Sequence, residues 1–457
     1  MRRTVHEQLR LVPKIIDHEH ARELSQISAV LDQLPEAVEL IHADLLEQGG
    51  KRVDPAKGRA GMTAEQVLRA LIVKQMNHYS YEELSFHLID STTYRWFCRI
   101  GIEQKSLTKS TLQKNIKRVR AETWEAINRK LVLCAAALGV ETGAKVRTDC
   151  TVVESNIHKP TDSTLLWDSV RVLVRLMGEA EEEFGVNFTD HSRRAKRRAL
   201  GILNAKSNEQ RLPYYRDLLR VTEKTVRSAE RIAGELDKAG VVGLFALLRA
   251  GALAHQLRHY VALAKRVIGQ TERRVLNGES VPAEEKIVSI FEPHTDIIVK
   301  DRRETLYGHK ICLTSGASGL VTDVVVEEGN PADSTLAVKM IERQRAMYGK
   351  LPRQVSFDGG FTSRDNLETL KELGVEDVAF TKRGGLQITE MVKSSWVYRR
   401  LRNFRAGIEG TVSFLKRVFG LNRCTWSGFR SFKAYVCGSV LACNLLVLAR
   451  HLLEAAA

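Results

Sequence analysis

The stretch Val146-Arg-Thr-Asp-Cys-Thr-Val-Val153 marks the point at which the chain changes from helical to strand periodicity. Branched and apolar side chains alternate there with polar ones, which is the two-residue period of a β-strand. A second strand ends in Val355-Ser-Phe-Asp-Gly-Gly-Phe361, with Asp358 directly after its apolar run. Because helical segments lie before, between and after these two strands, the sequence predicts an α/β fold.

Further elements follow from the same periodicities. Strands are predicted at 145–153, 286–291, 309–315, 320–326, 354–357 and 377–380, and helices at 334–348, 364–373 and from about 397 onward. Asp333 is expected to cap the first of these helices. The polar stretch between the first two strands is helical. This order is that of an RNase H-like α/β core in residues 141–457, with a long helical insertion after the first strand, at about 163–285.

The first 57 residues are predicted to form a helical arm. Leu24, Ile27 and Leu31 recur at helical spacing, and the Gly49-Gly50 pair and the stretch 55–61 then break the pattern.

Residues 58–140 are predicted to be all helical. Thr63 and Ser80 each have Gln or Glu three residues on, the capping-box pattern, and Ser110 is predicted to open a third helix. This third helix is basic and carries Lys117 and Arg118. The region therefore looks like a helix-turn-helix DNA-binding unit, although a small helical bundle with a solvated basic face fits the sequence equally well.

Composition indicates a folded protein with a polyanionic partner. The 457 residues are 44% hydrophobic and 27% charged, which argues against global disorder, and 70 Lys and Arg against 55 Asp and Glu give a net charge of +15. The seven cysteines are scattered without a CxxC pair, which excludes a zinc ribbon and fits a reducing compartment. The uncharged run 434–449 is too short to span a bilayer and predicts a buried core helix. We expect a cytoplasmic protein that makes no membrane contact.

Three carboxylates are candidates for a metal site. In a sheet ordered 3-2-1-4-5 the first and fourth strands are parallel neighbours, so Asp149 and Asp358 would meet at the switch point of the sheet. Their mutual repulsion would be offset by Mg²⁺, which prefers carboxylate and phosphate oxygens. Glu409 is one of only two acidic residues between 382 and 433, among twelve Lys or Arg. The alternatives are a salt-bridging Asp149, turn chemistry at Asp358, and a surface Glu409 paired with Arg405 or Lys416.

Three motifs resemble a known family. Val146-Arg-Thr-Asp-Cys-Thr-Val-Val-Glu-Ser-Asn-Ile157, Ser356-Phe-Asp-Gly-Gly-Phe361 and Arg405-Ala-Gly-Ile-Glu-Gly-Thr-Val-Ser-Phe-Leu-Lys-Arg417 are similar to the acidic motifs of the DDE transposases of bacterial insertion sequences, of the ISNCY type. The third motif of the related clan reads Tyr, Arg, Glu, Lys at fixed spacing. Here Arg402 stands at the Tyr position, which puts only the role of that tyrosine in doubt.

The resemblance implies that Asp149, Asp358 and Glu409 are the catalytic, metal-binding triad, with Mg²⁺ as cofactor and Mn²⁺ able to substitute. It also implies that Arg405 and Lys416 contact phosphates, and that Lys117 and Arg118 belong to a DNA-binding region.

The implied function is transposition. Such an enzyme binds double-stranded DNA at the terminal inverted repeats and at the target, frees a 3′-hydroxyl by hydrolysis, and joins it to target DNA. Because two ends are brought together, a homodimer or larger assembly is expected on DNA, within the bacterial nucleoid. Two alternatives remain: a transposase-derived repressor without catalytic activity, and a non-transposing RNase H-like nuclease. The basic cluster 193–198 fits either a DNA-contacting face of the insertion or a solvated one.

Overall fold

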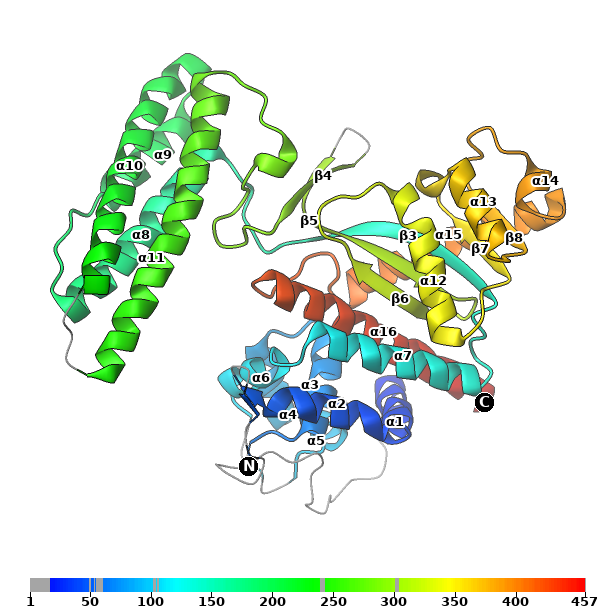
Figure 1. Cartoon of the computed structure of the whole chain (residues 1–457). Helices are drawn as coiled ribbons and strands as arrows, with labels where there is room; N and C mark the ends of the chain where they lie inside the picture. The colour runs from blue at the N-terminus through cyan, green and yellow to red at the C-terminus, as the bar shows by residue number, and fades with distance from the viewer. Residues whose placement is uncertain are drawn as a thin grey trace. The chain divides into compact units, whose positions relative to one another are not determined.

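The computed structural model describes residues 17–48, 51–52, 54, 61–101, 104, 107–238, 243–300 and 304–456 (Figure 1). The Gly49-Gly50 break, Pro55 and the boundary predicted near residue 57 lie outside these ranges. The chain divides into two compact units. The first comprises Met1–Glu154 and His309–Ala457, and the second comprises Ser155–Gly308.

The N-terminal part of the first unit is helical, as predicted. Its elements are α1 (Glu19–Asp32), α2 (Pro35–Leu46), the two-residue strands β1 (Glu47–Gln48) and β2 (Lys51–Arg52), α3 (Ala64–Met76), α4 (Tyr81–Asp90), α5 (Thr92–Phe97), α6 (Lys109–Ile116) and α7 (Ala121–Ala137). The capping boxes at Thr63 and Ser80 are confirmed. The predicted start of the third helix at Ser110 is wrong. The N-cap of α6 is Thr108, whose hydroxyl accepts the backbone N–H of Thr111.

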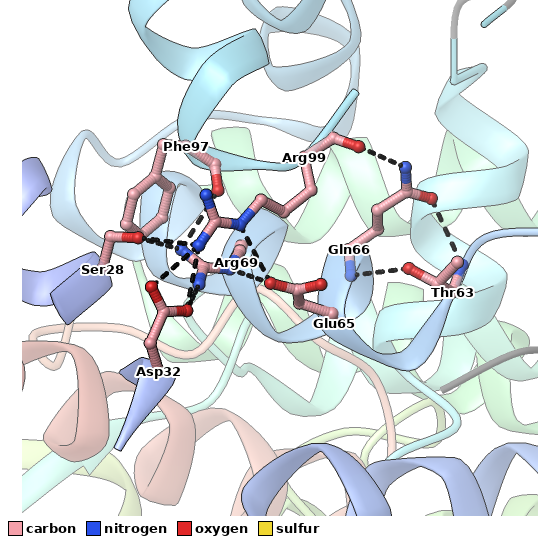
Figure 2. Close-up of polar contacts among 8 residues, drawn as sticks. All are labelled: Ser28, Asp32, Thr63, Glu65, Gln66, Arg69, Phe97 and Arg99. Atoms are coloured by element: carbon pink, nitrogen blue, oxygen red, sulfur yellow. Dashed lines mark hydrogen bonds and ion pairs between the residues drawn. The ribbon is translucent and has the colours of Figure 1, made fainter. Parts of the chain in front are cut away.

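Two buried arginines tie α1 to α3 and to the segment after α5 (Figure 2). Arg69 and Arg99 both donate to the Asp32 carboxylate, at 2.8 and 2.9 Å, and to the Glu65 carboxylate, at 3.0 Å each. Ser28 accepts from both guanidinium groups. Because each buried cation has two acidic partners, its charge is compensated, and the cluster links α1 to α3 and to the segment after α5.

The larger sheet of the structure has six strands. Its strands are β3 (Lys145–Glu154), β4 (Asp296–Lys300), β5 (Glu304–Ser315), β6 (Val321–Val326), β7 (Gln354–Phe357) and β8 (Asp377–Phe380). β5 lies beside β3 and pairs antiparallel with β6, while β7 lies on the other side of β3 and runs parallel to both β3 and β8. Without β4, the order is the predicted 3-2-1-4-5. β4 pairs with the first half of β5 and was not predicted from the sequence.

The C-terminal half of the chain supplies the helices that accompany this sheet. They are α12 (Ala337–Tyr348), α13 (Arg364–Glu372), the short α14 (Ile388–Met391), α15 (Ser395–Val418) and α16 (Phe429–Ala456). Phe357 of β7 packs on Phe361 and on Phe380 of β8, with ring centroids 5.3 and 5.6 Å apart. These aromatic side chains belong to a core that also contains residues of α12, α13 and α15. The core anchors the carboxyl end of β7, where Asp358 follows.

α16 is the buried core helix that the uncharged run predicts. By length and composition alone it could cross a membrane, but 72% of its most apolar window is buried. It packs against α1, α3 and α7 (Figure 1). Its polar residue Asn444 accepts the Val321 N–H at 2.8 Å and donates to the Val321 carbonyl and to Asn128, both at 2.7 Å. These bonds satisfy Asn444 inside a protein core.

The second unit is dominated by four helices that pack side by side (Figure 1). They are α8 (Asp162–Phe184), α9 (Ser192–Asn204), α10 (Asn208–Lys238) and α11 (Leu244–Thr271), followed by a π-helical turn at Glu272–Leu276 and a 3-10 turn at Ala283–Glu285. Their inward faces form one apolar core. The structure thus has helices between the first strand and β4, where the sequence predicts an insertion.

The strand predicted at 286–291 is wrong. The Gln270 side chain of α11 accepts the Ile287 N–H at 2.9 Å and donates to the Ile287 carbonyl at 3.1 Å, so this backbone is paired with a side chain rather than a strand. Ile287 and Ile290 are buried in the core of the helical unit. The apolar character of this segment therefore reflects packing against helices.

Candidate active site

Asp149 and Asp358 lie on adjacent parallel strands. Thr148 of β3 is in register with Phe357 of β7, and each aspartate is the next residue along its strand. Asp149 is largely buried within β3, whereas Asp358 directly follows β7 and is 40% exposed. The parallel pairing thus places the two carboxylates at the same level of the sheet.

Glu409 reaches this level because α15 is anchored to both strands. The Arg147 guanidinium of β3 donates to the Phe404 carbonyl at 2.8 Å, and the Ser356 hydroxyl of β7 donates to the Leu401 carbonyl at 3.0 Å. Arg147 can approach α15 closely because residue 407 is glycine, and a Cβ there would overlap the guanidinium. The residues that dock the helix therefore lie two positions before the two aspartates in the sequence.

All three carboxylates contact a single guanidinium. One nitrogen of Arg405, Nη2, lies 2.8 Å from Asp149 Oδ2 and 3.1 Å from Asp358 Oδ1. The neighbouring Nη1 donates to Glu409 Oε1 at 2.7 Å. Since both aspartate oxygens lie within 3.1 Å of one atom, they are separated by less than twice that distance. The structure thus brings Asp149, Asp358, Glu409 and Arg405 together.

The four groups differ in exposure. The side chains of Arg405 and Asp149 are 13% and 16% exposed, while that of Glu409 is 66% exposed. Burial raises the pKa of Asp149 to about 6, an effect that Arg405 opposes and the nearby Asp358 charge increases. The second Asp149 oxygen accepts the Cys150 N–H at 2.8 Å. The three carboxyl groups of the site therefore share one permanent positive charge, that of Arg405.

The donor chemistry of this site fits a divalent cation. Carboxylate oxygens are the hard ligands that Mg²⁺ and Mn²⁺ take, and three carboxylates exceed the charge that Arg405 alone can neutralise. Among the described residues, no group of three or more His, Cys, Asp or Glu is arranged to hold a metal ion by itself. In the structure the carboxylates instead surround Arg405.

Two further polar residues lie near the aspartates and were not identified as site residues from the sequence. Lys310 of β5 donates to the Asp333 carboxylate at 2.8 Å and to the Pro331 carbonyl at 2.7 Å. The predicted capping role of Asp333 is wrong, because the N-cap of its 3-10 turn is Ala332 and its carboxylate pairs with Lys310. A Cβ at Gly360 would contact this Asp333 carboxylate, so the glycines after Asp358 permit close approach.

The other predicted residues lie at different places. Lys416 is on α15, two turns beyond Glu409. The prediction that the third helix carries Lys117 and Arg118 is wrong, because α6 ends at Ile116. Lys117 is its C-cap, with the ammonium 5.6 Å from the centre of the Trp426 ring. Arg118 follows it and is half-buried. Contact of these three residues with DNA stays a prediction.

The docking of α15 gives a stability prediction. Gly407→Ala should lower the free energy of unfolding by about 0.5–2 kcal/mol, because displacing Arg147 from the Phe404 carbonyl leaves a buried charged donor unpaired and outweighs the gain in helix propensity. The measurement is thermal or urea unfolding of the purified protein.

Gly410→Ala is the matched control, since it lies on the same helix and a Cβ there meets nothing within 4 Å. It should gain about 0.5–1 kcal/mol from the better helix propensity of alanine. If Gly407→Ala were as stable as Gly410→Ala, the Arg147 contact would not be what holds α15 to the sheet.

Comparison with known families gives two matches. Residues 295–445 match the family described as "Transposase DDE domain", and residues 12–118 match the family described as "Transposase domain (DUF772)". The first match includes Asp358, Arg405 and Glu409 and begins after Asp149. No curated protein and no solved structure matches the chain.

Proposed function

Since the chain belongs to the DDE transposases of bacterial insertion sequences, we propose that it cleaves DNA at the ends of its element and joins the freed 3′-hydroxyl to target DNA. The observation that carries this proposal is the meeting of three carboxylates, from β3, the end of β7 and α15, on one guanidinium. Carboxylates from separate elements repel one another when they lie close together. Such a cluster destabilises the fold unless a cation offsets the negative charge.

In this proposal Asp149, Asp358 and Glu409 hold Mg²⁺, for which Mn²⁺ can substitute. When bound, the metal supplies activation of a water or a 3′-hydroxyl and stabilisation of the leaving oxygen. Asp149 provides a fixed ligand within a central strand, and Glu409 an exposed one on a helix.

Positive charge at the site also comes from the chain itself. Arg405 neutralises part of the carboxylate charge, and its planar guanidinium suits bidentate contact with a phosphate. Lys416, further along α15, is proposed as a second phosphate contact, acting as a point charge. Both residues would then orient the scissile strand.

The proposed partner is double-stranded DNA, at the terminal inverted repeats and at the target. Residues 58–140 would bind the ends through a helix-turn-helix-like arrangement, and a homodimer or larger assembly would hold two ends together. We place the protein in the cytoplasm, at the nucleoid. The subgroup of the family stays a prediction.

The decisive experiment is cleavage of a labelled duplex that carries the end of the element and its flanking DNA. Strand cleavage at the element boundary that requires Mg²⁺ or Mn²⁺ and stops with chelator is expected. Tight binding to the end without cleavage in any metal would favour the repressor instead. Metal-dependent cleavage without preference for the end would favour a non-transposing nuclease.

The contribution of Lys117 and Arg118 can be tested by neutralisation. Lys117→Gln with Arg118→Gln should weaken binding to the element end and lower the slope of log affinity against log salt by about one unit for each phosphate that these side chains neutralise. The measurement is fluorescence anisotropy across a salt series.

Arg353→Gln serves as control, because this exposed cation already pairs with Glu376 at 2.8 Å. Thermal unfolding must accompany the comparison, since Lys117 also packs over Trp426. A folded double variant with an unchanged salt slope would mean that this segment does not contact the DNA backbone.

A further inference from the structure

A group of cations lies along two adjacent helices of the helical unit. We define the α9–α10 basic face as Arg193, Arg194, Lys196, Arg197 and Arg198 of α9 together with Arg216, Arg220 and Lys224 of α10. α9 and α10 pack against each other (Figure 1). The buried residues of α9, Ala195 and Ile202, lie on the opposite side of that helix from Arg193 and Arg197.

A single acid joins the two helices within this face. Asp217 of α10 accepts from Arg194 and from Arg198 of α9, with closest distances of 2.5 Å. Hydrogen bonding from Arg194 is the main cause that lowers the pKa of Asp217, so its carboxylate stays charged. These pairs hold the α9 and α10 cations on one continuous surface.

Six cations of the face are left without partners. Within the described part of the chain, no hydrogen bond or ion pair involves the side chains of Arg193, Lys196, Arg197, Arg216, Arg220 and Lys224. All six side chains are exposed. Of the acids near the row on α10, Asp217 pairs with Arg194 and Arg198, and Glu223 pairs with Arg227. The face therefore presents uncompensated positive charge to solvent.

Solubility alone does not explain this arrangement. Surfaces that only keep a protein soluble mix charges of both signs. Elsewhere in this unit cations do pair with acids: Arg249 of α11, for example, pairs with Glu179 and Glu183 of α8. A face on which six exposed cations lack such partners among the described residues is therefore suited to a negatively charged partner.

The spacing of the cations fits a phosphate backbone. Arg216, Arg220 and Lys224 recur every four residues, so they form a row along one side of α10 with a rise of about 6 Å per step. Arg193 and Arg197 form a shorter row of the same spacing on α9. Because a DNA strand carries a phosphate about every 3.4 Å along its axis, such rows can meet several phosphates at once.

We propose that the α9–α10 basic face binds the sugar-phosphate backbone of duplex DNA without reading its sequence. This inference rests on the proposed function, since it adds a second DNA contact outside both the carboxylate site and residues 58–140. Arginine-rich rows without acceptor groups suit phosphate oxygens, which take charge-assisted, bidentate hydrogen bonds.

The test uses the full chain, an element-end duplex of about 40 base pairs and chelator, so that cleavage does not interfere. The row variant is Arg216→Gln with Arg220→Gln and Lys224→Gln. Its salt slope should fall by about one unit for each phosphate that the row neutralises in the parent, up to about three units, with weaker binding at low salt. Because these side chains are exposed and unpaired, its thermal unfolding should match that of the parent.

The matched control removes the same charge from the same unit at paired positions. It is Arg249→Gln with Arg258→Gln and Lys265→Gln, whose partners are Glu179 and Glu183, Asp237, and Glu230. The control should keep most of the parent slope. An equal fall in both variants, or no fall in the row variant, would overturn the proposal. A parent that fails to bind the duplex at all would instead contradict the proposed function.

Discussion

Asp358→Asn should remove strand cleavage while leaving the fold and end-binding intact. The amide keeps the shape of the side chain but loses the charge that a divalent cation requires. Loss of about 4 kcal/mol of transition-state stabilisation would slow cleavage by about 10³-fold. The measurement is the rate of nicking of a labelled element-end duplex in Mg²⁺ and in Mn²⁺, alongside binding affinity in chelator.

Asp365→Asn is the matched control, because the same chemical change occurs at an exposed position on α13, seven residues further along the chain. It should cleave at the parent rate. Metal-dependent nicking that survives in Asp358→Asn would rule out Asp358 as a ligand. If neither the parent nor Asp358→Asn cleaves the duplex although both bind the element end tightly, the result would support a repressor.

Local sequence is sufficient to predict two of the strands and two of the helix caps. β7 and β8 are predicted with their observed bounds, since each is a short apolar run closed by turn residues. The capping boxes of α3 and α4 are likewise predicted, because three residues decide them. At α6 the same rule fails, since Thr108 and Ser110 are both capping residues and the sequence does not rank them.

Contacts distant in sequence account for the errors. The strand predicted at 286–291 is wrong because the Ile287 backbone bonds to the Gln270 side chain instead of to another strand. The local sequence does not reveal this contact. β4, which the sequence does not predict, pairs with the first half of β5 only.

The candidate site shows the same division. Topology predicts that Asp149 and Asp358 lie side by side, since the strand order makes their strands neighbours. The sequence offers an Arg405–Glu409 pair only as the alternative to a metal-binding Glu409, and the structure contains this pair. That Arg405 also contacts both aspartates depends on how α15 docks on β3 and β7, which the sequence does not specify.

Arg405→Ala should cost about 3 kcal/mol of stability, the low end for removing one partner of a buried ion pair. The variant leaves Asp149, largely buried, beside Asp358 and Glu409 without the guanidinium that all three contact. Arg399→Ala removes a charge from an exposed position of the same helix and should be nearly neutral. Thermal unfolding of both variants in chelator measures the difference.

The same pair of variants also tests what the carboxylates can bind. If they take a divalent cation, Mg²⁺ or Mn²⁺ should raise the unfolding midpoint of Arg405→Ala more than that of Arg399→Ala, because a ligand that binds only the folded state stabilises it and here also relieves repulsion. An Arg405→Ala protein as stable as the control in chelator would mean that the three ion pairs contribute nothing net. A destabilised variant that metal does not rescue would leave Arg405 as a structural cation and argue against metal binding by the three carboxylates.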